Sequence, residues 1–260
     1  MIVTTCYRPT AKQEKRCITA QNYFAATFVP RQKRSIASII SKYGQDVLVV
    51  SNDAYILYTK SSEQPLLFHP GSAMFRMKRL KKGAYDPFLE ATQLKRGMRF
   101  LDCTLGMGTD ALLAAYCVGS NGKVSGIEKS RILSFIVADG FQNYLYDLDP
   151  SFETSMRRIQ VFSGDHYEKL KEMPTNAYDV VYFDPMFENP IVSSKGIEAL
   201  REKACYDILT DKAVKEAMRV ASQRVVLKAH YQSALFSTLG FHVIKRKTAQ
   251  FHFGWIENNS

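Results

Sequence analysis

The sequence has no cysteine pattern that would bind a metal or build a disulfide framework. Its five cysteines are odd in number and form no Cys-x-x-Cys pair, so neither a zinc site nor a disulfide-stapled fold is expected. No apolar run approaches the ~20 residues that cross a bilayer, and residues 1–9 lack the basic flank and apolar core of a secretory signal. We therefore expect a reduced, cytoplasmic protein with no membrane segment and no metal.

Positive charge is concentrated in the first third of the chain. The 260 residues contain no repeat or low-complexity tract, and they are enough for one large α/β domain and a small additional one. The net charge is +10, yet residues 1–86 hold 14 Lys or Arg against 5 Asp or Glu, while the remaining residues hold 21 against 20. A basic module beside a neutral one indicates a polyanion partner. Lysines that only keep the first region soluble would give the same pattern.

The first 75 residues are predicted to form a small basic α+β module that could bind RNA. Ser35 is placed to cap a helix that runs through Tyr43 and ends at Gly44. Two β-branched and aromatic runs flank Asn52-Asp53 and predict a hairpin. The module should therefore contain one helix among short strands, with the strands at residues 23–29, 46–51 and 54–60.

Residues 76–97 are predicted to form a basic connection that leads into the rest of the chain. Five cations, which we predict to bind substrate, occupy seven positions before Gly83: Arg76, Lys78, Arg79, Lys81 and Lys82. Lys and Arg neutralise phosphates without contacting a base, so this segment could form the rim of an RNA or DNA groove. A solvated connection between domains is the alternative.

Strands alternate with helices from residue 98 to the end of the chain. This order predicts a mostly parallel, doubly wound sheet of the α/β class, whose ligands lie at the carboxyl ends of its strands. We assign residues 98–260 to one catalytic domain. Its expected strands are 98–103, 123–128, 159–163, 178–183, 224–229, 242–247 and 250–256, and its expected helices are 109–118, 130–146, 167–173, 197–220 and 233–239.

The most informative motif is Asp184-Pro185-Met186-Phe187, at the end of an apolar strand. An ionised Asp184 only accepts hydrogen bonds, and Pro185 has no N–H, which leaves its carbonyl as a second acceptor. Phe187 offers a ring face on which a planar group can stack. Such a site would hold an amino group and orient its nitrogen without a strong base. An Asp-Pro turn that only ends a buried strand is the alternative.

A loop with two glycines, Gly106 and Gly108, follows the first strand of the catalytic domain. Glycines one residue apart let the backbone turn tightly and approach a ligand before a helix begins. Glu128 ends the next strand, where an acidic residue is placed to bind both ribose hydroxyls of a nucleotide cofactor. A dinucleotide fingerprint requires a third glycine where Ala111 stands, and Asp102 in the first turn suits a cationic ligand better than a pyrophosphate.

Four strand ends carry an acidic residue, namely Asp102, Glu128, Asp165 and Asp184. Asp165, which precedes His166, could accept a hydrogen bond from an adenine amino group. Each acid alone could be a helix cap. Together the four favour S-adenosylmethionine, which carries both an ammonium and a sulfonium, over NAD.

Four segments together resemble class I methyltransferases: Asp102-Cys-Thr-Leu-Gly-Met-Gly-Thr-Asp110, Gly126-Ile-Glu-Lys129, Tyr182-Phe-Asp-Pro-Met-Phe187 and Arg224-Val-Val-Leu-Lys228. From about Phe75 to Trp255 their order is similar to that of the J-type small-subunit rRNA guanine-N2 methyltransferases. Met186, where many amino-methyltransferases place a second proline, points to that family. The resemblance implies a Rossmann-like seven-stranded sheet, S-adenosylmethionine as cofactor, and rRNA or the small ribosomal subunit as partner.

The resemblance also implies which residues contact the cofactor. Besides Asp102 and the two glycines, they are Thr109, Asp110, Glu128, Lys129, Asp165, His166 and Asp184. Two stretches depart from the family. Cys103-Thr104-Leu105 and Met107 replace smaller loop residues, and Glu188-Asn189-Pro190 replaces a more basic segment. These departures leave the predicted cofactor unchanged, but they weaken the inference of which nucleotide is methylated.

The expected reaction is direct methyl transfer to an exocyclic amine, most simply guanine N2 of small-subunit rRNA. The base would leave its stack or lie in a loop and stack on Phe187, while Asp184 and the Pro185 carbonyl hold the amino protons. Lys228 is expected either to touch the base or a phosphate, or only to solvate the end of its strand. A protein glutamine N-methyltransferase is an alternative that the basic first third disfavours. A non-enzymatic ribosome- or RNA-binding protein on the same fold is another, which intact Asp184 and Glu128 disfavour.

Overall fold

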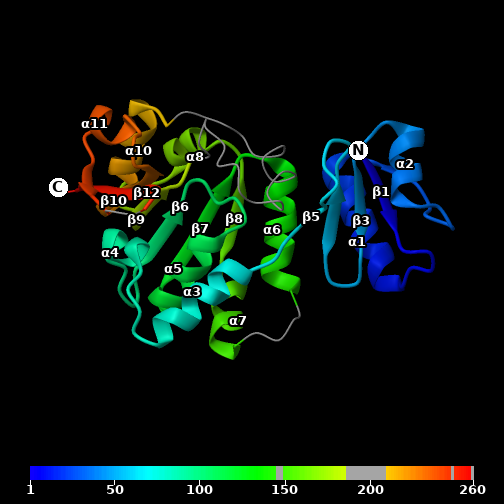
Figure 1. Ribbon diagram of the computed structural model, residues 1–260, viewed down its shortest axis with the longest axis horizontal. Coiled ribbons are helices and arrows are strands. Elements are labelled where there is room, and N and C mark those ends of the chain that lie inside the picture. Colours follow the sequence, from blue (N-terminus) through cyan, green and yellow to red (C-terminus); the bar gives the residue numbers. More distant parts are fainter. Residues whose placement is uncertain (145–148, 186–208, 247–248, 259–260) are drawn as a thin grey trace.

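Two separate sheets organise the molecule (Figure 1). The computed structural model describes residues 1–144, 149–185, 209–246 and 249–258. The N-terminal sheet has five strands in the order β2-β1-β3-β4-β5, with β1 parallel to β2 and β3. Its strands are β1 (Ile2–Thr5), β2 (Thr27–Phe28), β3 (Val47–Val50), β4 (Tyr55–Tyr58) and β5 (Leu66–Leu67). The antiparallel pair β3 and β4 confirms the predicted hairpin.

The second sheet has seven strands in the order β11-β12-β10-β9-β6-β7-β8, which confirms the predicted Rossmann-like architecture. Strands β6 to β10 are parallel to one another, and β12 runs antiparallel to both β10 and β11. The strands are β6 (Arg99–Asp102), β7 (Lys123–Glu128), β8 (Gln160–Ser163), β9 (Tyr178–Phe183), β10 (Ala221–His230), β11 (His242–Ile244) and β12 (Phe251–Glu257).

Helices cover both faces of the seven-stranded sheet. Along β9 the side chains alternate: Val180 and Tyr182 belong to the core under α5, whereas Val181 and Phe183 belong to the core under α10. A strand buried on both faces has no polar side, which is why residues 180–183 of β9 are a continuous apolar run in the sequence. The helices of this part are α3 (Gly71–Lys81), α4 (Pro87–Thr92), α5 (Thr109–Val118), α6 (Arg131–Asn143), α7 (Pro150–Arg157), α8 (His166–Glu172), α10 (Asp211–Val220) and α11 (Leu235–Thr238).

The order of the central strands brings two of the predicted acids together. Strand β6 lies between β7 and β9, so the chain leaves β6 toward one edge of the sheet and returns to its other side with β9. Such a reversal opens a crevice at the carboxyl ends of the two strands. Asp102 ends β6, and Asp184 directly follows β9. The topology therefore places both acids at the same crevice.

The N-terminal module differs from the prediction in its helices. Besides α2 (Ile36–Tyr43), which Ser35 caps as predicted, it contains α1 (Ala11–Phe24). The predicted strand at residues 23–29 is wrong, since Tyr23 and Phe24 close α1 and only two residues of that range are a strand. A capping box starts α1, because Thr10 accepts from the backbone N–H of Gln13 while Gln13 accepts from that of Thr10.

The bounds of several other helices and strands agree with the prediction, and one predicted helix begins among residues that the structure does not describe. Helix α5 and strands β7 and β9 have the predicted bounds. The predicted helix at residues 197–220 begins at Asp211 within the described part, with Thr210 as its cap, and residues 197–208 lie outside the described residues. Helices α3, α4 and α7 were not predicted. No helix in the described ranges is long and apolar enough to cross a lipid bilayer.

The N-terminal module packs on α6 through one buried ion pair and a cluster of rings. Arg16 donates to both carboxylate oxygens of Asp139, at 2.8 and 2.9 Å, and its guanidinium lies 4.3 Å from the centroid of the Tyr55 ring. Phe135 of α6 contacts Tyr23, Phe24 and Tyr55 with centroid distances of 4.7 to 5.0 Å. The pair is 11% and 13% exposed, so solvent screens it little.

We expect Asp139→Ala to lower the free energy of unfolding by about 2 to 3 kcal/mol, because it leaves the Arg16 guanidinium buried without its partner. Urea denaturation measures this difference. Asp53→Ala is the matched control, since it removes a 3.7 Å pair with Lys12 whose side chains are 42% and 55% exposed. It should change stability by less than about 0.5 kcal/mol. Equal effects of the two substitutions would contradict the assigned role of Arg16.

Candidate active site

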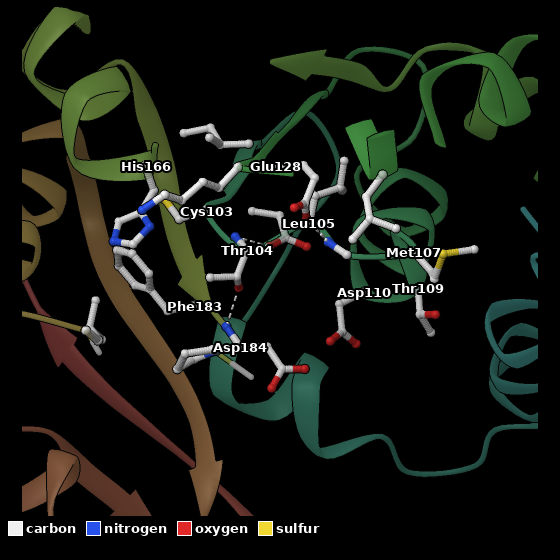
Figure 2. A pocket seen from close by; sticks show the side chains of 17 residues that line it. Cys103, Thr104, Leu105, Met107, Thr109, Asp110, Glu128, His166, Phe183 and Asp184 are labelled. Carbon is white, nitrogen blue, oxygen red and sulfur yellow. Dashed lines mark hydrogen bonds between the residues drawn. The ribbon is translucent and has the colours of Figure 1, made fainter. Parts of the chain in front are cut away.

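A cavity of about 240 Å³ opens at the carboxyl ends of the central strands (Figure 2). Its polar lining comes from the loops after β6, β7 and β9 and from the start of α8. Nine of the predicted site residues line this cavity, and Thr104, which was not predicted, lines it with them. The nine are Asp102, Gly106, Thr109, Asp110, Glu128, Lys129, His166, Asp184 and Pro185. Apolar side chains that were not predicted complete it, among them Leu105, Met107, Leu133 and Leu209.

The two glycines of the loop have different roles. Gly106 has a φ of +52° and lines the cavity, and its N–H donates to Glu128 Oε2 at 2.9 Å. Gly108 is the N-cap of α5 with a φ of +74°, and it is not among the described residues that line the cavity. A Cβ at this position would lie 2.4 Å from Cζ of Phe141. Gly108 therefore lets α5 pack against α6, whereas Gly106 forms the cavity itself.

Glu128 holds the loop and remains able to accept more hydrogen bonds. Its second oxygen, Oε1, accepts from the N–H of Ser130 at 2.7 Å, so each oxygen has one backbone donor. A carboxylate has about four lone-pair sites, and those left over can accept from hydroxyls in the cavity. Burial raises the pKa of Glu128, and the two backbone N–H groups oppose this rise. The position fits the predicted contact to a ribose.

Asp102 is a buried carboxyl that lacks a cationic partner in the described part of the chain. It is 2% exposed, lines the cavity and accepts from the N–H of Thr104 at 3.0 Å. Burial raises the pKa of Asp102 well above its ordinary value, and the nearby Asp110 raises it further. A cation in the cavity would offset both effects. The carboxylate of Asp102 at this end of the cavity thus fits a positively charged ligand.

Asp165 differs from the other three acids because it caps a helix. Its Oδ1 accepts from the N–H groups of Tyr167 and Glu168 at 2.9 and 3.3 Å, and its Oδ2 pairs with Nζ of Lys129 at 3.1 Å. Asp165 is not among the described residues that line the cavity, although Lys129 and His166 are. The predicted contact of Asp165 with an adenine amino group stays a prediction.

Asp184 and Lys228 form the centre of an ion cluster, which we define as Arg76, Asp110, Asp184 and Lys228. Nζ of Lys228 lies 2.5 Å from Oδ2 of Asp184 and 3.8 Å from Oδ2 of Asp110. Arg76 pairs with Oδ1 of Asp110 at 2.5 Å and with Asp86 at 2.8 Å. The cluster joins α3, α5 and the ends of β9 and β10, so it connects four segments of the chain.

Each charged group of this cluster stabilises the ionised form of an oppositely charged neighbour. Burial disfavours the ammonium of Lys228, but Asp184 and Asp110 outweigh burial and raise the pKa of Lys228. Burial likewise opposes ionisation of Asp110, yet Lys228 and Arg76 lower its pKa below the ordinary value. Burial raises the pKa of Asp184, against the attraction of Lys228. Lys228 therefore stays protonated at neutral pH and is the principal support for an ionised Asp184.

Thr104 is a site residue that the sequence reasoning treated only as a departure from the family. Its Oγ1 accepts from the backbone N–H of Asp184 at 2.6 Å, which Figure 2 shows as a dashed line between the two. This bond ties the loop after β6 to the turn after β9. Because 80 residues separate the two positions, no local pattern in the sequence could have revealed it.

The five predicted basic residues of the connection lie in and just after α3 and do not act alike. Arg76 points inward to the ion cluster, and Lys81 pairs with Asp149 at 2.6 Å. Lys78, Arg79 and Lys82 are exposed. The predicted stacking residue, Phe187, lies outside the described residues, as do Met186 and the segment 188–190.

The arrangement matches known methyltransferases in fold. A solved structure of a SAM-dependent methyltransferase from Neisseria gonorrhoeae superposes with a TM-score of 0.64 at 17% identity, covering 100% of this chain and 96% of that one. The family model described as "Putative SAM-dependent methyltransferase" matches residues 41–253, and that span includes every residue of the cavity. The chain belongs to this methyltransferase family.

Relatives within the family extend along most or all of the chain. Uncharacterized protein YpiP of Bacillus subtilis (strain 168) is 41% identical over 258 residues, 99% of this chain and 100% of its own length. Ribosomal RNA small subunit methyltransferase J of Dechloromonas aromatica is 29% identical over 176 residues, 65% of this chain and 69% of its own length. Family and fold imply S-adenosylmethionine as methyl donor. Asp102, a buried acid with no cationic partner among the residues that the structure describes, and Glu128, which keeps acceptor capacity in the cavity, fit that ligand.

We expect the affinity for S-adenosylmethionine to rise with pH until the raised pKa of free Asp102 is passed. Below that pKa the cation must displace a proton from Asp102, so binding releases protons and weakens by up to about tenfold per pH unit. Above it the carboxyl is already ionised and the affinity levels off. Calorimetric titration across pH, in buffers of different ionisation enthalpy, measures both effects.

Asp102→Asn should remove this proton release and weaken binding by about tenfold or more. Asp211→Asn is the control, because Asp211 forms an exposed pair with Lys215 on α10 and should leave the pH profile unchanged. A wild-type proton release that survives in Asp102→Asn would show that Asp102 does not face the cation.

The two loop glycines should differ in their sensitivity to alanine. Gly106→Ala adds only the cost of a left-handed backbone, about 1 to 2 kcal/mol of stability, since the nearest atom to the new Cβ is 3.9 Å away. Gly108→Ala adds the overlap with Phe141 and should cost about 2 to 5 kcal/mol. Urea denaturation compares them, and Phe141→Leu should recover part of the Gly108→Ala loss. Equal losses for the two alanine variants would contradict the packing role of Gly108.

Proposed function

We propose that this protein transfers a methyl group from S-adenosylmethionine to an exocyclic amino group of a nucleobase, and that its substrate is guanine N2 in small-subunit rRNA. The observation that carries this proposal is the position of Asp184. Its carboxylate lines the cavity at the carboxyl ends of the central strands, and at the same time it belongs to the ion cluster through its pair with Lys228. An acceptor group at that point can hold an amine beside the methyl donor.

The proposed chemistry needs orientation more than base strength. S-adenosylmethionine supplies a methyl group made electrophilic by the sulfonium. Asp184 and the carbonyl of Pro185 each accept a hydrogen bond from one N–H of the amino group of the base, which aims the nitrogen lone pair into the cavity. As the N–C bond forms, the bond between the methyl carbon and the sulfonium sulfur would break, and its electron pair would stay on sulfur as a neutral thioether. The methylated nitrogen then carries one excess proton, which Asp184 can accept or pass to water. The stacking of the base on Phe187 stays a prediction from the sequence, since that residue lies outside the described residues.

Lys228 has a positioning role in this proposal. Its ammonium occupies Oδ2 of Asp184 and leaves Oδ1 of the same carboxylate to accept an amino N–H. The charge of Lys228 also favours the ionised form of Asp184, which is the form that accepts. The pairs with Asp184 and Asp110 give Lys228 more than the solvation of a strand end, and its contact with the base or a phosphate stays a prediction.

The choice of rRNA rests on charge and on the relatives. Residues 1–86 carry 14 Lys or Arg against 5 Asp or Glu, an excess that suits a polyanion. The relative from Dechloromonas aromatica is named a ribosomal RNA small subunit methyltransferase J. A base of folded rRNA must be unpaired or flipped to reach Asp184, so a loop or an assembly intermediate is the expected substrate.

Transfer of radiolabel from S-adenosylmethionine tests the proposal, with naked small-subunit rRNA, small subunits and a protein extract as acceptors. We expect label in RNA, and nucleoside analysis should locate it on guanine N2. Asp184→Asn should lower kcat by about a hundredfold or more while the protein still binds the cofactor and stays folded. Asp211→Asn should retain full activity. Label that enters only protein would refute the proposal in favour of a protein methyltransferase.

A further inference from the structure

A second cavity lies on the other side of the ion cluster. It has a volume of about 300 Å³ and lies between α3, the turn before α4, and the strand β12. Asp110 lines both cavities, and Lys228 lines the second while it binds Asp184 of the first. The two cavities are thus neighbours that share the ion cluster as their common wall.

Two arginines line this second cavity with uncommitted guanidinium groups. Within residues 1–144, 149–185, 209–246 and 249–258, no carboxylate pairs with the side chain of Arg79 or Arg246, whereas Arg76 beside them is engaged by Asp86 and Asp110. A guanidinium that has no protein carboxylate is available to an anion from solution. Its planar donors match a phosphate with two parallel hydrogen bonds.

An exposed aromatic ring completes the cavity. Tyr85 is 60% exposed, although its hydroxyl donates to Glu90, so the ring is held at one end while a face remains accessible. Phe251 also lines the cavity, and its ring centroid lies 5.7 Å from Nζ of Lys228. An exposed ring beside two guanidinium groups that pair with no described carboxylate matches the stacking platforms and cationic grooves of proteins that bind single-stranded nucleic acid.

We propose that the second cavity binds the nucleotide that flanks the target in an unpaired RNA segment. Arg79 and Arg246 bind its phosphate and Tyr85 stacks on its base, so that the next base along the strand reaches Asp184 across the shared wall. This inference rests on the proposed RNA methylation and deepens it. It also distinguishes among the predicted basic residues: Arg79 contacts substrate, whereas Arg76 supports the wall.

Steady-state methylation of the small-subunit RNA substrate tests this site through the variants Arg79→Gln and Arg246→Gln. Each should raise KM for RNA by about tenfold, because each loses a charge-assisted phosphate contact. Each should also reduce by about one the slope of log affinity against log salt, measured with a short fluorescent single-stranded RNA in the presence of S-adenosylhomocysteine. The affinity for S-adenosylmethionine should not change.

Arg158→Gln is the matched control, since Arg158 is an exposed arginine just after α7, at the opposite, amino-terminal edge of the sheet. It should leave KM and the salt slope unchanged. Tyr85→Phe should bind RNA as the wild type does, because the ring remains, while Tyr85→Ala should bind about tenfold more weakly. Comparison of these two Tyr85 variants separates the contribution of ring stacking from that of the hydrogen bond to Glu90.

The outcomes distinguish the two proposals. RNA that is methylated with the same KM and salt slope in Arg79→Gln, Arg246→Gln and Arg158→Gln would overturn the second cavity as a nucleotide site and leave the proposed function intact. Label found only in protein would overturn the proposed function itself. Loss of RNA affinity in both arginine variants, with Arg158→Gln unaffected and cofactor binding retained, would support the site.

Discussion

The ion pair between Lys228 and Asp184 is the interaction on which the arrangement of the site depends. It joins the ends of β9 and β10, and through Asp110 and Arg76 it reaches α5 and α3. Withdrawing charges from water is costly unless each has a partner, and removal of one partner leaves a partly buried charge without compensation. The segments that carry these residues must therefore keep their relative positions. That requirement fixes the wall between the two cavities and the direction of the Asp184 carboxylate.

The topology of the sheet explains why the cluster can form at all. Strands β6 and β9 are neighbours although more than 70 residues separate their ends in the chain, and the crossing between them opens the crevice at their carboxyl ends. The bond from Asp184 N–H to Thr104 Oγ1 joins the two loops directly. Asp102 then remains as a buried acid without a cation in the described part of the chain, which makes the cofactor cavity electrostatically incomplete until a cation enters.

The prediction from sequence succeeded where the pattern was local. The apolar run of β9, the glycine loop and the helix that follows it have one structural solution, and their bounds agree with the structure. It failed at α1, because this helix buries only Gln13, Cys17 and Ala20, and its last aromatics, Tyr23 and Phe24, look like part of a strand. Those rings contact Phe135 of α6, a tertiary contact that no local pattern encodes.

The sequence alone determined the α/β class, the carboxyl-terminal position of four acids and the excess of positive charge in the first third, because strand periodicity and composition are properties of the chain itself. Only the tertiary structure decided which charges meet. It turned Arg76 inward to Asp110, paired Asp165 with Lys129, and left Arg79 and Arg246 beside Tyr85 in a second cavity. The physical reason is that an ion pair depends on distances of a few ångströms between residues far apart in the chain, and those distances exist only after the sheet has formed.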